Sequence, residues 1–321
     1  MTANATLPPA AAAWLDKTLE RHAESPADRI EPLAVEASTR LFFRVHAGAT
    51  TRVLMCSPPA TENNAAFVAV AELLARHGVG VPDILAHDVD AGLLLLTDLG
   101  SRHFGDLYAA GDAQRCLDAA EATLAQLRAL PTDAVPDYTP ARLSDELDIC
   151  IDWLVRPTDS ALPDALFEPA REGLLANAAD QEQVFVHRDF HCRNLLLRAD
   201  DSVGVVDFQD ALIGPEHYDR ASLLYDCYWR FDDDTIARHA PSESWRMERL
   251  AIQRQLKAVG IFARLASRDD KTTHLRYIDD VLACTISLCA RQDSAPLRRL
   301  GEWLEATLAP NARRWVAARS C

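Results

Sequence analysis

Residues 183–209 read QVFVHRDFHCRNLLLRADDSVGVVDFQ, and in this stretch a highly polar run interrupts apolar ones. The apolar runs have the length and composition of short buried β-strands, and they lie at 183–186, 194–198 and 203–208. The polar run, 187–194, falls where the chain should be buried, and burying so many polar groups is costly unless they bind something. The stretch therefore predicts a functional loop between strands.

The spacing of three polar residues indicates the chemistry of this loop. It has the form H-x-D-x-x-x-x-N with Asp189 and Asn194, and Asp207 follows eighteen residues after Asp189 at the end of the next strand. Phosphoryl transfer of the kinase type uses one carboxylate at the substrate hydroxyl, and an amide and a second carboxylate at Mg²⁺. Mg²⁺ takes hard oxygen ligands and needs few of them from the protein. We therefore expect Asp189 to be catalytic and Asn194 and Asp207 to hold the metal.

The first hundred residues combine two kinds of hydrophobic period. Between residues 10 and 22, Ala11, Leu15 and Leu19 recur every four positions, which is typical of an amphipathic helix. Runs of period two and a second helical run follow, and they predict strands at 30–35, 40–46, 51–56, 81–88 and 92–100 and a helix at 62–77. Gly78 stands where the C-terminal cap of that helix is needed.

The rest of the chain is almost wholly helical apart from the strands around the polar loop. Its apolar spacing predicts helices at 112–130, 143–154, 165–178, 221–231, 244–267, 274–291 and 295–319. The whole pattern predicts an α+β fold of two lobes, 1–100 and 101–321, joined by a hinge that follows Leu96.

The composition excludes several classes of partner. Lys and Arg number 33 against 48 Asp and Glu, which gives a formal net charge of -15. Such a surface repels phosphate backbones and anionic lipid, so we expect neither nucleic acid nor a membrane as partner. No apolar stretch approaches the length of a membrane span, and the eight cysteines are scattered as reduced core cysteines are. We expect a cytoplasmic protein.

The polar motifs resemble those of the aminoglycoside phosphotransferase family, the small-molecule branch of the protein-kinase-like fold. The resemblance rests on 187–194, on 205–209 and on Tyr218-Asp219-Arg220-Ala221-Ser222, which is similar to that family's Y-D-x-A segment. It implies a nucleotide-binding N-lobe with a five-stranded antiparallel sheet and a helix. It also implies a mainly helical C-lobe with a catalytic β-hairpin and the metal and acceptor sites. ATP and Mg²⁺ are the implied cofactors, and Asp219 is the implied structural brace of the catalytic loop.

Further segments are similar to the bacterial kinases that phosphorylate the anomeric (C1) hydroxyl of N-acetylmuramate and N-acetylglucosamine in peptidoglycan recycling. They are 36–40, Phe43-Arg44, Pro58-Pro59, 207–215 and 223–226. This similarity implies an amino sugar and ATP as partners. It also implies acceptor contacts at Asp210 and on the acidic helix before the catalytic loop, at Glu146, Asp152 and Trp153. A carboxylate suits sugar hydroxyls, and an aromatic ring suits the sugar face.

The chain departs from the protein-kinase pattern at the lysine of the third strand. No lysine lies between Lys17 and Lys257, and the register of the family places Met55 at the lysine position and Val53 over the adenine. Methionine cannot neutralise phosphate, so an arginine must do so or Mg²⁺ must carry that charge.

Three arginines are candidates for this role, Arg40, Arg44 and Arg52. Strand alternation turns Arg52 to the face opposite Val53 and Met55, which leaves Arg40 or Arg44 to bind the nucleotide.

The remaining nucleotide contacts are also implied by the resemblance. The glycine-rich loop of kinases is missing, so Ser38 and Thr39 would cover the phosphates, and the hinge residues Thr97, Asp98 and Leu99 would lie beside the adenine. Glu62 would either pair with the phosphate-binding arginine or occupy the first turn of a helix.

Two other functions stay open at this point. An aminoglycoside or choline-type kinase would have a cationic substrate, which the net charge of -15 would attract. A nucleotide-binding regulator without catalysis is favoured by the missing lysine and glycines.

Overall fold

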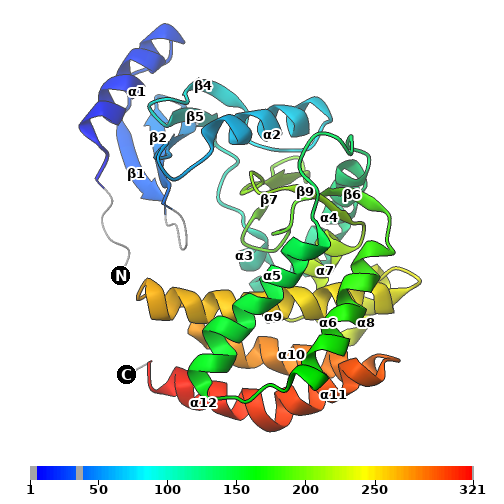
Figure 1. Ribbon diagram of the computed structural model, residues 1–321. Helices are drawn as coiled ribbons and strands as arrows, with labels where there is room; N and C mark the ends of the chain where they lie inside the picture. The colour runs from blue at the N-terminus through cyan, green and yellow to red at the C-terminus, as the bar shows by residue number, and fades with distance from the viewer. Residues whose placement is uncertain (1–5, 34–38, 320–321) are drawn as a thin grey trace. The chain divides into compact units, whose positions relative to one another are not determined.

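The chain folds into two compact units in the computed structural model, which describes residues 6–33 and 39–319 (Figure 1). One unit is Met1–His103 with Asn194–Asp210, and the other is Phe104–Arg193 with Ala211–Cys321. The hairpin that carries Asn194 and Asp207 therefore belongs to the first unit, whereas Asp189 belongs to the second.

The first unit is built on a five-stranded antiparallel sheet. In spatial order its strands are β1 (Arg29–Leu33), β2 (Leu41–Ala47), β3 (Thr50–Cys56), β5 (Leu93–Thr97) and β4 (Ile84–Asp88). Helix α1 (Pro9–Arg21) packs on one face of this sheet, and its Ala11, Leu15 and Leu19 are at most 2% exposed. The four-residue spacing of these side chains gives α1 one apolar stripe, which the sheet buries.

Helix α2 (Asn64–Arg76) starts two residues later than its periodicity predicts. The side chain of Asn63 accepts a hydrogen bond from the Ala66 backbone N–H and so caps the helix, which leaves Glu62 outside it. Gly78 follows the helix with a φ of 79°, as the cap prediction requires. The alternative that Glu62 forms the first turn of the helix is therefore wrong.

The hairpin of β7 (Leu195–Leu197) and β8 (Val203–Val205) docks on the segment after α2. The Val205 N–H donates to the Gly80 carbonyl at 2.7 Å, and a Cβ on Gly80 would lie 2.3 Å from the Val203 carbonyl oxygen. Beside this contact the ring of Phe208 lies 4.9 Å from that of Phe67 on α2. Packing therefore links the segment that carries Asp207 to α2.

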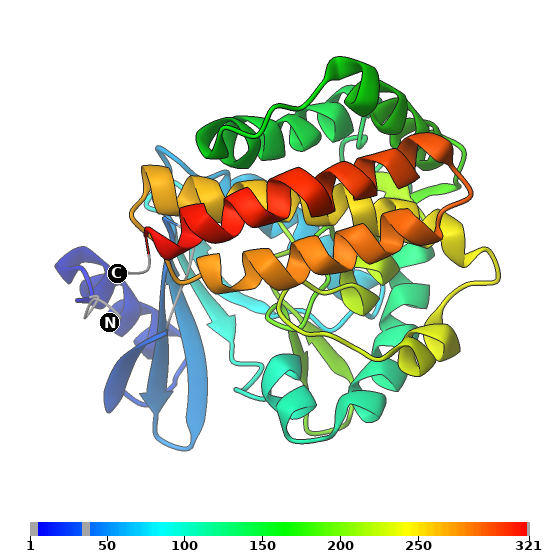
Figure 2. The same cartoon turned by 90° about the horizontal axis from the view of Figure 1, so that it is seen from below.

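The second unit is mainly helical. Its helices are α3 (Phe104–Ala109), α4 (Ala113–Arg128), α5 (Pro140–Cys150), α6 (Asp164–Ala179), α7 (Tyr218–Leu224), α8 (Asp233–His239), α9 (Ser244–Arg268), α10 (Ile278–Arg291), α11 (Ala295–Trp303) and α12 (Ala309–Ala317). Strands β6 (Gln183–Val186) and β9 (Leu212–Pro215) form an antiparallel pair. The long helix α9 packs against α5, α6, α7 and α10 (Figure 2). No helix of the described residues is long and apolar enough to cross a membrane.

The predicted fold class is confirmed, and the differences lie in individual elements. The helix predicted at 221–231 instead runs from Tyr218 to Leu224. It ends there because Asp226 accepts hydrogen bonds from the N–H groups of Cys192 and Tyr228, at 2.8 and 2.7 Å, and so holds the chain in a turn. The three short elements α3, α8 and β9 were not predicted, since a periodicity needs a longer window to register.

Two predicted helices contain a π-helical turn. The helix predicted at 143–154 begins at Pro140 and passes into such a turn at Ile151–Val155. The one predicted at 295–319 is divided by a similar turn at Leu304–Leu308. π-Helical turns inside α-helices occur often at functional sites, and the first of these carries Asp152 and Trp153.

Gly260 sets how closely α9 approaches α5. A Cβ at this position would lie 2.6 Å from the Cys150 backbone nitrogen, so the two backbones would have to separate. We predict that Gly260→Ala lowers the free energy of unfolding by about 1–3 kcal/mol, the usual cost of overpacking.

A matched control is Gly173→Ala in α6, where a Cβ would meet no atom within 4 Å. This change should raise the free energy of unfolding by about 0.5–1 kcal/mol, because alanine favours a helix interior. Urea unfolding of both variants checks the prediction, and equal stabilities would contradict it.

Candidate active site

The segment predicted to be the catalytic loop, 187–194, follows β6 and is held at its start by Asp219, in the first turn of α7. The Asp219 carboxylate accepts the His187 N–H at 2.7 Å and the Arg188 N–H at 2.9 Å. Arg188 has a φ of 76°, an unfavourable conformation for an arginine. Backbone strain of this kind persists only where surrounding contacts enforce it, and it clusters at functional sites.

The other end of the loop is anchored by Asp226 and by aromatic rings. Asp226 accepts the Cys192 N–H at 2.8 Å. The guanidinium of Arg193 lies 3.7 Å from the Tyr228 ring centre and donates to the Tyr277 hydroxyl at 2.8 Å. Asp189 thus stands on a short segment that is fixed on both sides.

Asp189 combines partial exposure with a strongly positive environment. Its side chain is 38% exposed, and Arg254 of α9 approaches its carboxylate at 3.6 Å. Desolvation alone would raise the pKa of Asp189, but the charges of Lys257, His191, Arg254 and Arg188 outweigh it and hold that pKa well below its usual range. The carboxylate is therefore ionised at neutral pH and can accept a hydrogen bond from a substrate hydroxyl.

Glu146 of α5 lies at the centre of a buried ion network. Its carboxylate receives Arg188 at 2.5 Å and Lys257 at 3.1 Å, and it also accepts hydrogen bonds from Tyr138 and Gln253. Burial would raise the pKa of Glu146, but Lys257 and Arg188 hold it below its usual value. Since these four partners occupy both oxygens, Glu146 has the geometry of a residue that positions Arg188 and Lys257.

Three other residues are predicted to contact the acceptor, Asp152, Trp153 and Asp210. Asp152 is exposed and pairs with Arg156, four residues further along the chain. Trp153 is half-buried in the π-helical turn. Asp210 is exposed and belongs to the first unit.

The first unit brings the two predicted metal ligands together. Asn194 Nδ2 lies 3.5 Å from Asp207 Oδ2, and Gln209 Nε2 donates to Asp207 Oδ1 at 2.8 Å. Asp207 has a φ of 65°, a second strained position at a predicted functional residue. One carboxylate and one amide oxygen fit Mg²⁺, which keeps most of its waters and takes few protein ligands.

Arg40 is paired with Glu62 in the first unit. Its guanidinium lies 2.7 Å from the Glu62 carboxylate, donates to Ser57 Oγ at 3.3 Å and stands 5.9 Å from the Phe67 ring centre. Thr39 also donates to Glu62, whereas Ser38 lies outside the described residues. The pairing is the one that the sequence suggested for Glu62 and a phosphate-binding arginine.

Arg44 and Arg52 are held elsewhere. Arg44 makes a two-pronged ion pair with Asp98, at 2.6 and 3.1 Å, and donates to the Gly100 carbonyl at 2.8 Å. Arg52 pairs with Glu24 at 2.8 Å, on the face of β3 opposite Val53, as strand alternation predicts. Arg44 therefore stabilises the hinge segment, which leaves Arg40 as the better candidate for phosphate.

The residues predicted to form the hinge make their contacts within the first unit. The Thr97 N–H donates to the Asp83 carbonyl at 3.0 Å. Desolvation would raise the pKa of Asp98, but Arg44 and the Gly100 N–H hold it below its usual value. The Leu99 side chain lies 3.0 Å from where a Cβ on Gly204 would stand, so it packs on the β7–β8 hairpin. Val53 is half-buried, and Met55 is fully buried.

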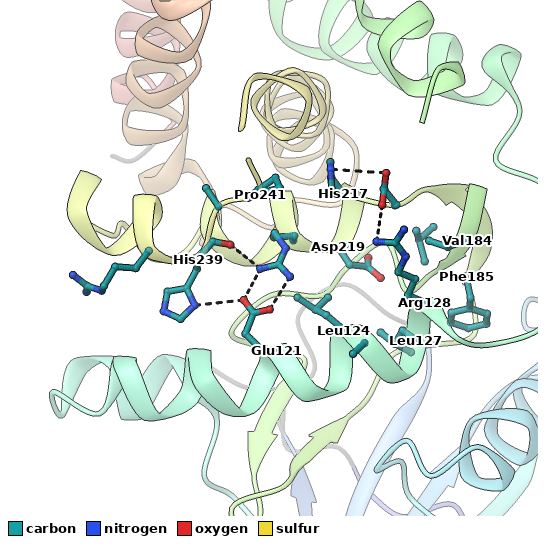
Figure 3. A pocket seen from close by; sticks show the side chains of 16 residues that line it. Glu121, Leu124, Leu127, Arg128, Val184, Phe185, His217, Asp219, His239 and Pro241 are labelled. Atoms are coloured by element: carbon teal, nitrogen blue, oxygen red, sulfur yellow. Dashed lines mark hydrogen bonds and ion pairs between the residues drawn. The ribbon is translucent and has the colours of Figure 1, made fainter. Parts of the chain in front are cut away.

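A cavity of about 500 Å³ lies in the second unit between α4 and the β6 and α7 segments (Figure 3). Its charged walls pair with each other, since Glu121 receives Arg220 at 2.5 and 2.6 Å and Glu216 receives Arg128 at 2.7 Å. Asp219 is part of the lining, but Asp189 is not. We therefore do not place the acceptor in this cavity.

Arg254 and Lys257 are the charged neighbours of Asp189 that the sequence did not reveal. They lie three positions apart on α9, so they share one face of that helix. The rarity of lysine in this chain was the one available signal, because Lys257 is one of only three.

Comparison with known proteins identifies the family. Residues 29–252 match the model of the phosphotransferase enzyme family. The chain is 35% identical over 297 residues to the N-acetylmuramate/N-acetylglucosamine kinase of Pseudomonas aeruginosa, covering 84% of this chain and 87% of that protein. It is 30% identical to the kinase of the same name from Caulobacter vibrioides, covering 89% and 94%. The chain belongs to the phosphotransferase enzyme family and is a kinase.

Solved structures support the same fold. A putative aminoglycoside phosphotransferase from Ralstonia eutropha superposes with a TM-score of 0.61 at 13% identity, over 94% of this chain and 99% of that one. The choline kinase LicA from Streptococcus pneumoniae gives a TM-score of 0.61 at 13% identity, over 86% and 98%. At such identities the likeness is one of fold alone.

The pairing of Arg40 with Glu62 generates a prediction for nucleotide binding. We predict that Arg40→Gln raises the KM for the nucleoside triphosphate about ten-fold to a hundred-fold, because a charged hydrogen bond to phosphate is lost. Steady-state kinetics with varied nucleotide measure the effect.

The matched control is Arg52→Gln, which removes the same charge from the opposite face of the sheet, where Arg52 pairs with Glu24. This variant should keep the KM of the unchanged enzyme. A KM that rises equally in both variants would show a general effect of charge and would remove Arg40 from the phosphate role.

Proposed function

We propose that this kinase transfers the γ-phosphoryl group of ATP, with Mg²⁺, to the anomeric hydroxyl of N-acetylmuramate, N-acetylglucosamine or both. The observation that carries the proposal is the ionised and partly exposed Asp189 among Arg188, Arg254 and Lys257. The Asp189 carboxylate can accept the proton of a substrate hydroxyl. The positive charges around it suit a substrate that is neutral or anionic. The names of the relatives supply the class of sugar.

Asp189 acts on the acceptor in this proposal. Its carboxylate orients the sugar hydroxyl, whose oxygen forms the new bond to the γ-phosphorus while the bond to the leaving ADP oxygen breaks. The hydroxyl proton passes to Asp189 and then to solvent. A hemiacetal hydroxyl is more acidic than an ordinary alcohol, and it therefore suits a carboxylate whose pKa is low.

Asn194 and Asp207 would hold Mg²⁺, which supplies positive charge to the phosphates when it is bound. Arg40, aligned by Glu62, would contact the same phosphates in place of the missing lysine. Asp219 would keep the His187 and Arg188 backbone in the strained form that aims Asp189.

The two rival functions are less well supported. A cationic aminoglycoside or choline would meet Arg188, Arg254 and Lys257 beside Asp189, so the local charge opposes it although the net charge of -15 attracts it. A regulator without catalysis has no need of an exposed carboxylate on a doubly anchored, strained loop. We also propose peptidoglycan recycling in the cytoplasm as the setting, since free amino sugars of this kind arise from cell-wall breakdown.

The role of Asp189 predicts a separation between turnover and nucleotide binding. Asp189→Asn should lower kcat by about 10²- to 10⁴-fold, the usual cost of losing a general base, with Mg·ATP affinity kept. Asp207→Ala should lose Mg²⁺-dependent ATP affinity, and Asn194→Ala should lose less because a neutral amide contributes less charge.

Coupled-assay kinetics and calorimetry with and without Mg²⁺ measure these effects. More than a tenth of the original rate in Asp189→Asn, or unchanged Mg·ATP affinity in Asp207→Ala, would contradict the assigned roles.

The anomeric position is tested with modified sugars. The methyl glycoside of N-acetylglucosamine should be inert because its C1 hydroxyl is blocked, whereas the 6-deoxy sugar should still react. Phosphorus NMR of the products identifies the phosphorylated carbon. An active methyl glycoside would move the reaction to another hydroxyl, and efficient turnover of aminoglycosides would favour the rival kinase.

A further inference from the structure

Lys257 is slightly more exposed than the two arginines around Asp189, and it shares its protein partner with one of them. The Arg188 and Arg254 side chains are each 8% exposed, and both bond to the protein, Arg188 to Glu146 at 2.5 Å and Arg254 to the Arg188 carbonyl at 3.2 Å. The Lys257 side chain is 12% exposed and reaches the same Glu146 oxygen from 3.1 Å. Lys257 therefore shares one Glu146 oxygen with Arg188, which holds that oxygen at the shorter distance.

The ammonium group of Lys257 has donors left for a ligand. It carries three N–H donors, and its bond to Glu146 uses one of them. Arg254, three positions away on the same face of α9, lies 3.6 Å from the Asp189 carboxylate, and the charge of Lys257 lowers the pKa of that carboxylate. Lys257 therefore lies on the side of α9 that faces Asp189, where the acceptor binds in the proposed function. A group that binds beside Asp189 thus meets an ammonium that can still donate.

The other charges of this region are committed to the backbone or to one another. The Asp219 carboxylate accepts two N–H groups of the loop, and the Asp226 carboxylate accepts the N–H groups of Cys192 and Tyr228. An anion that binds beside Asp189 would therefore meet the Lys257 ammonium, with Asp189 as the nearby negative charge.

The two sugars of the proposed function differ in this respect. N-acetylmuramate carries a carboxylate on its lactyl ether, and N-acetylglucosamine does not. In a protein with a net charge of -15, an anionic sugar needs a local cation to bind as well as a neutral one does.

We propose that Lys257 is a specificity-determining residue that binds the carboxylate of the acceptor sugar and so favours N-acetylmuramate over N-acetylglucosamine. This inference rests on the proposed function, because it takes both sugars as acceptors. It assigns to α9 a role in choosing the substrate, in addition to supporting Asp189 through Arg254.

The test is a double-mutant cycle in which the lysine is changed in the protein and the carboxylate is changed in the ligand. Lys257→Met keeps the length of the side chain and removes its charge, while Arg188, Tyr138 and Gln253 still hold Glu146. The ratio of kcat/KM for N-acetylmuramate to that for N-acetylglucosamine should fall about ten-fold or more in this variant, the size of a charged hydrogen bond. Lys257→Arg should restore most of the ratio, and Lys17→Met, on the exposed side of α1, should leave it unchanged.

The second arm changes the ligand and keeps the protein. The methyl ester of N-acetylmuramate should be a poorer acceptor than the acid for the unchanged enzyme and an equal one for Lys257→Met. Equal losses for both sugars in Lys257→Met would overturn the proposal and make Lys257 a support of Glu146. A rise confined to the KM for ATP would also overturn it, because the ammonium would then serve the nucleotide. If the unchanged enzyme phosphorylates neither sugar, the proposed function itself fails, and this result is distinct from the others.

Discussion

The conformation of the candidate catalytic loop, 187–194, depends on the carboxylate of Asp219, which accepts the backbone N–H groups of His187 and Arg188. Arg188 sits at a φ of 76°, and a residue of this size occupies that region only where other contacts enforce it. The side chain of Arg188 is also buried, and Glu146 neutralises it at 2.5 Å. Removing one partner of such a buried pair typically costs about 3–5 kcal/mol, so Asp219 and Glu146 together fix the conformation that presents Asp189.

The same arrangement explains why Asp189 has a positively charged environment in a protein with a net charge of -15. The carboxylates of Glu146, Asp219 and Asp226 are all turned toward loop backbone or buried cations. Arg254 and Lys257 therefore act on Asp189 at short range, where solvent screens them little. The net charge acts on a ligand at long range, as it approaches the protein. The buried charges act on the ligand once it is bound beside Asp189.

In the first unit Arg40 has the contacts that our proposal requires of a substitute for the missing lysine. Arg40 pairs with Glu62, stands over Phe67 of α2, and Phe67 in turn packs on Phe208 beside Asp207. Arg40, the residue just before β2, thus pairs with an acidic residue just before α2, while Met55 on β3 is a buried apolar side chain. Because the ring contacts join α2 to the hairpin, the candidate phosphate and metal residues belong to one packed layer.

The sequence by itself determined the elements whose information is local. The four-residue spacing of Ala11, Leu15 and Leu19 predicts α1 and the face that it buries, because a helix repeats every 3.6 residues. The polar run 187–194 between apolar strands likewise predicts a functional loop, since burying polar groups without a ligand is costly. The tertiary structure alone decided what depends on distant partners. It showed that Glu146, expected at the sugar, is enclosed by Arg188 and Lys257, that Asp226 ends α7, and that α9 brings Lys257 to the catalytic loop. These outcomes depend on which backbone segments approach each other closely, as α5 and α9 do at Gly260. The periodicity of a single sequence does not predict such contacts between distant segments.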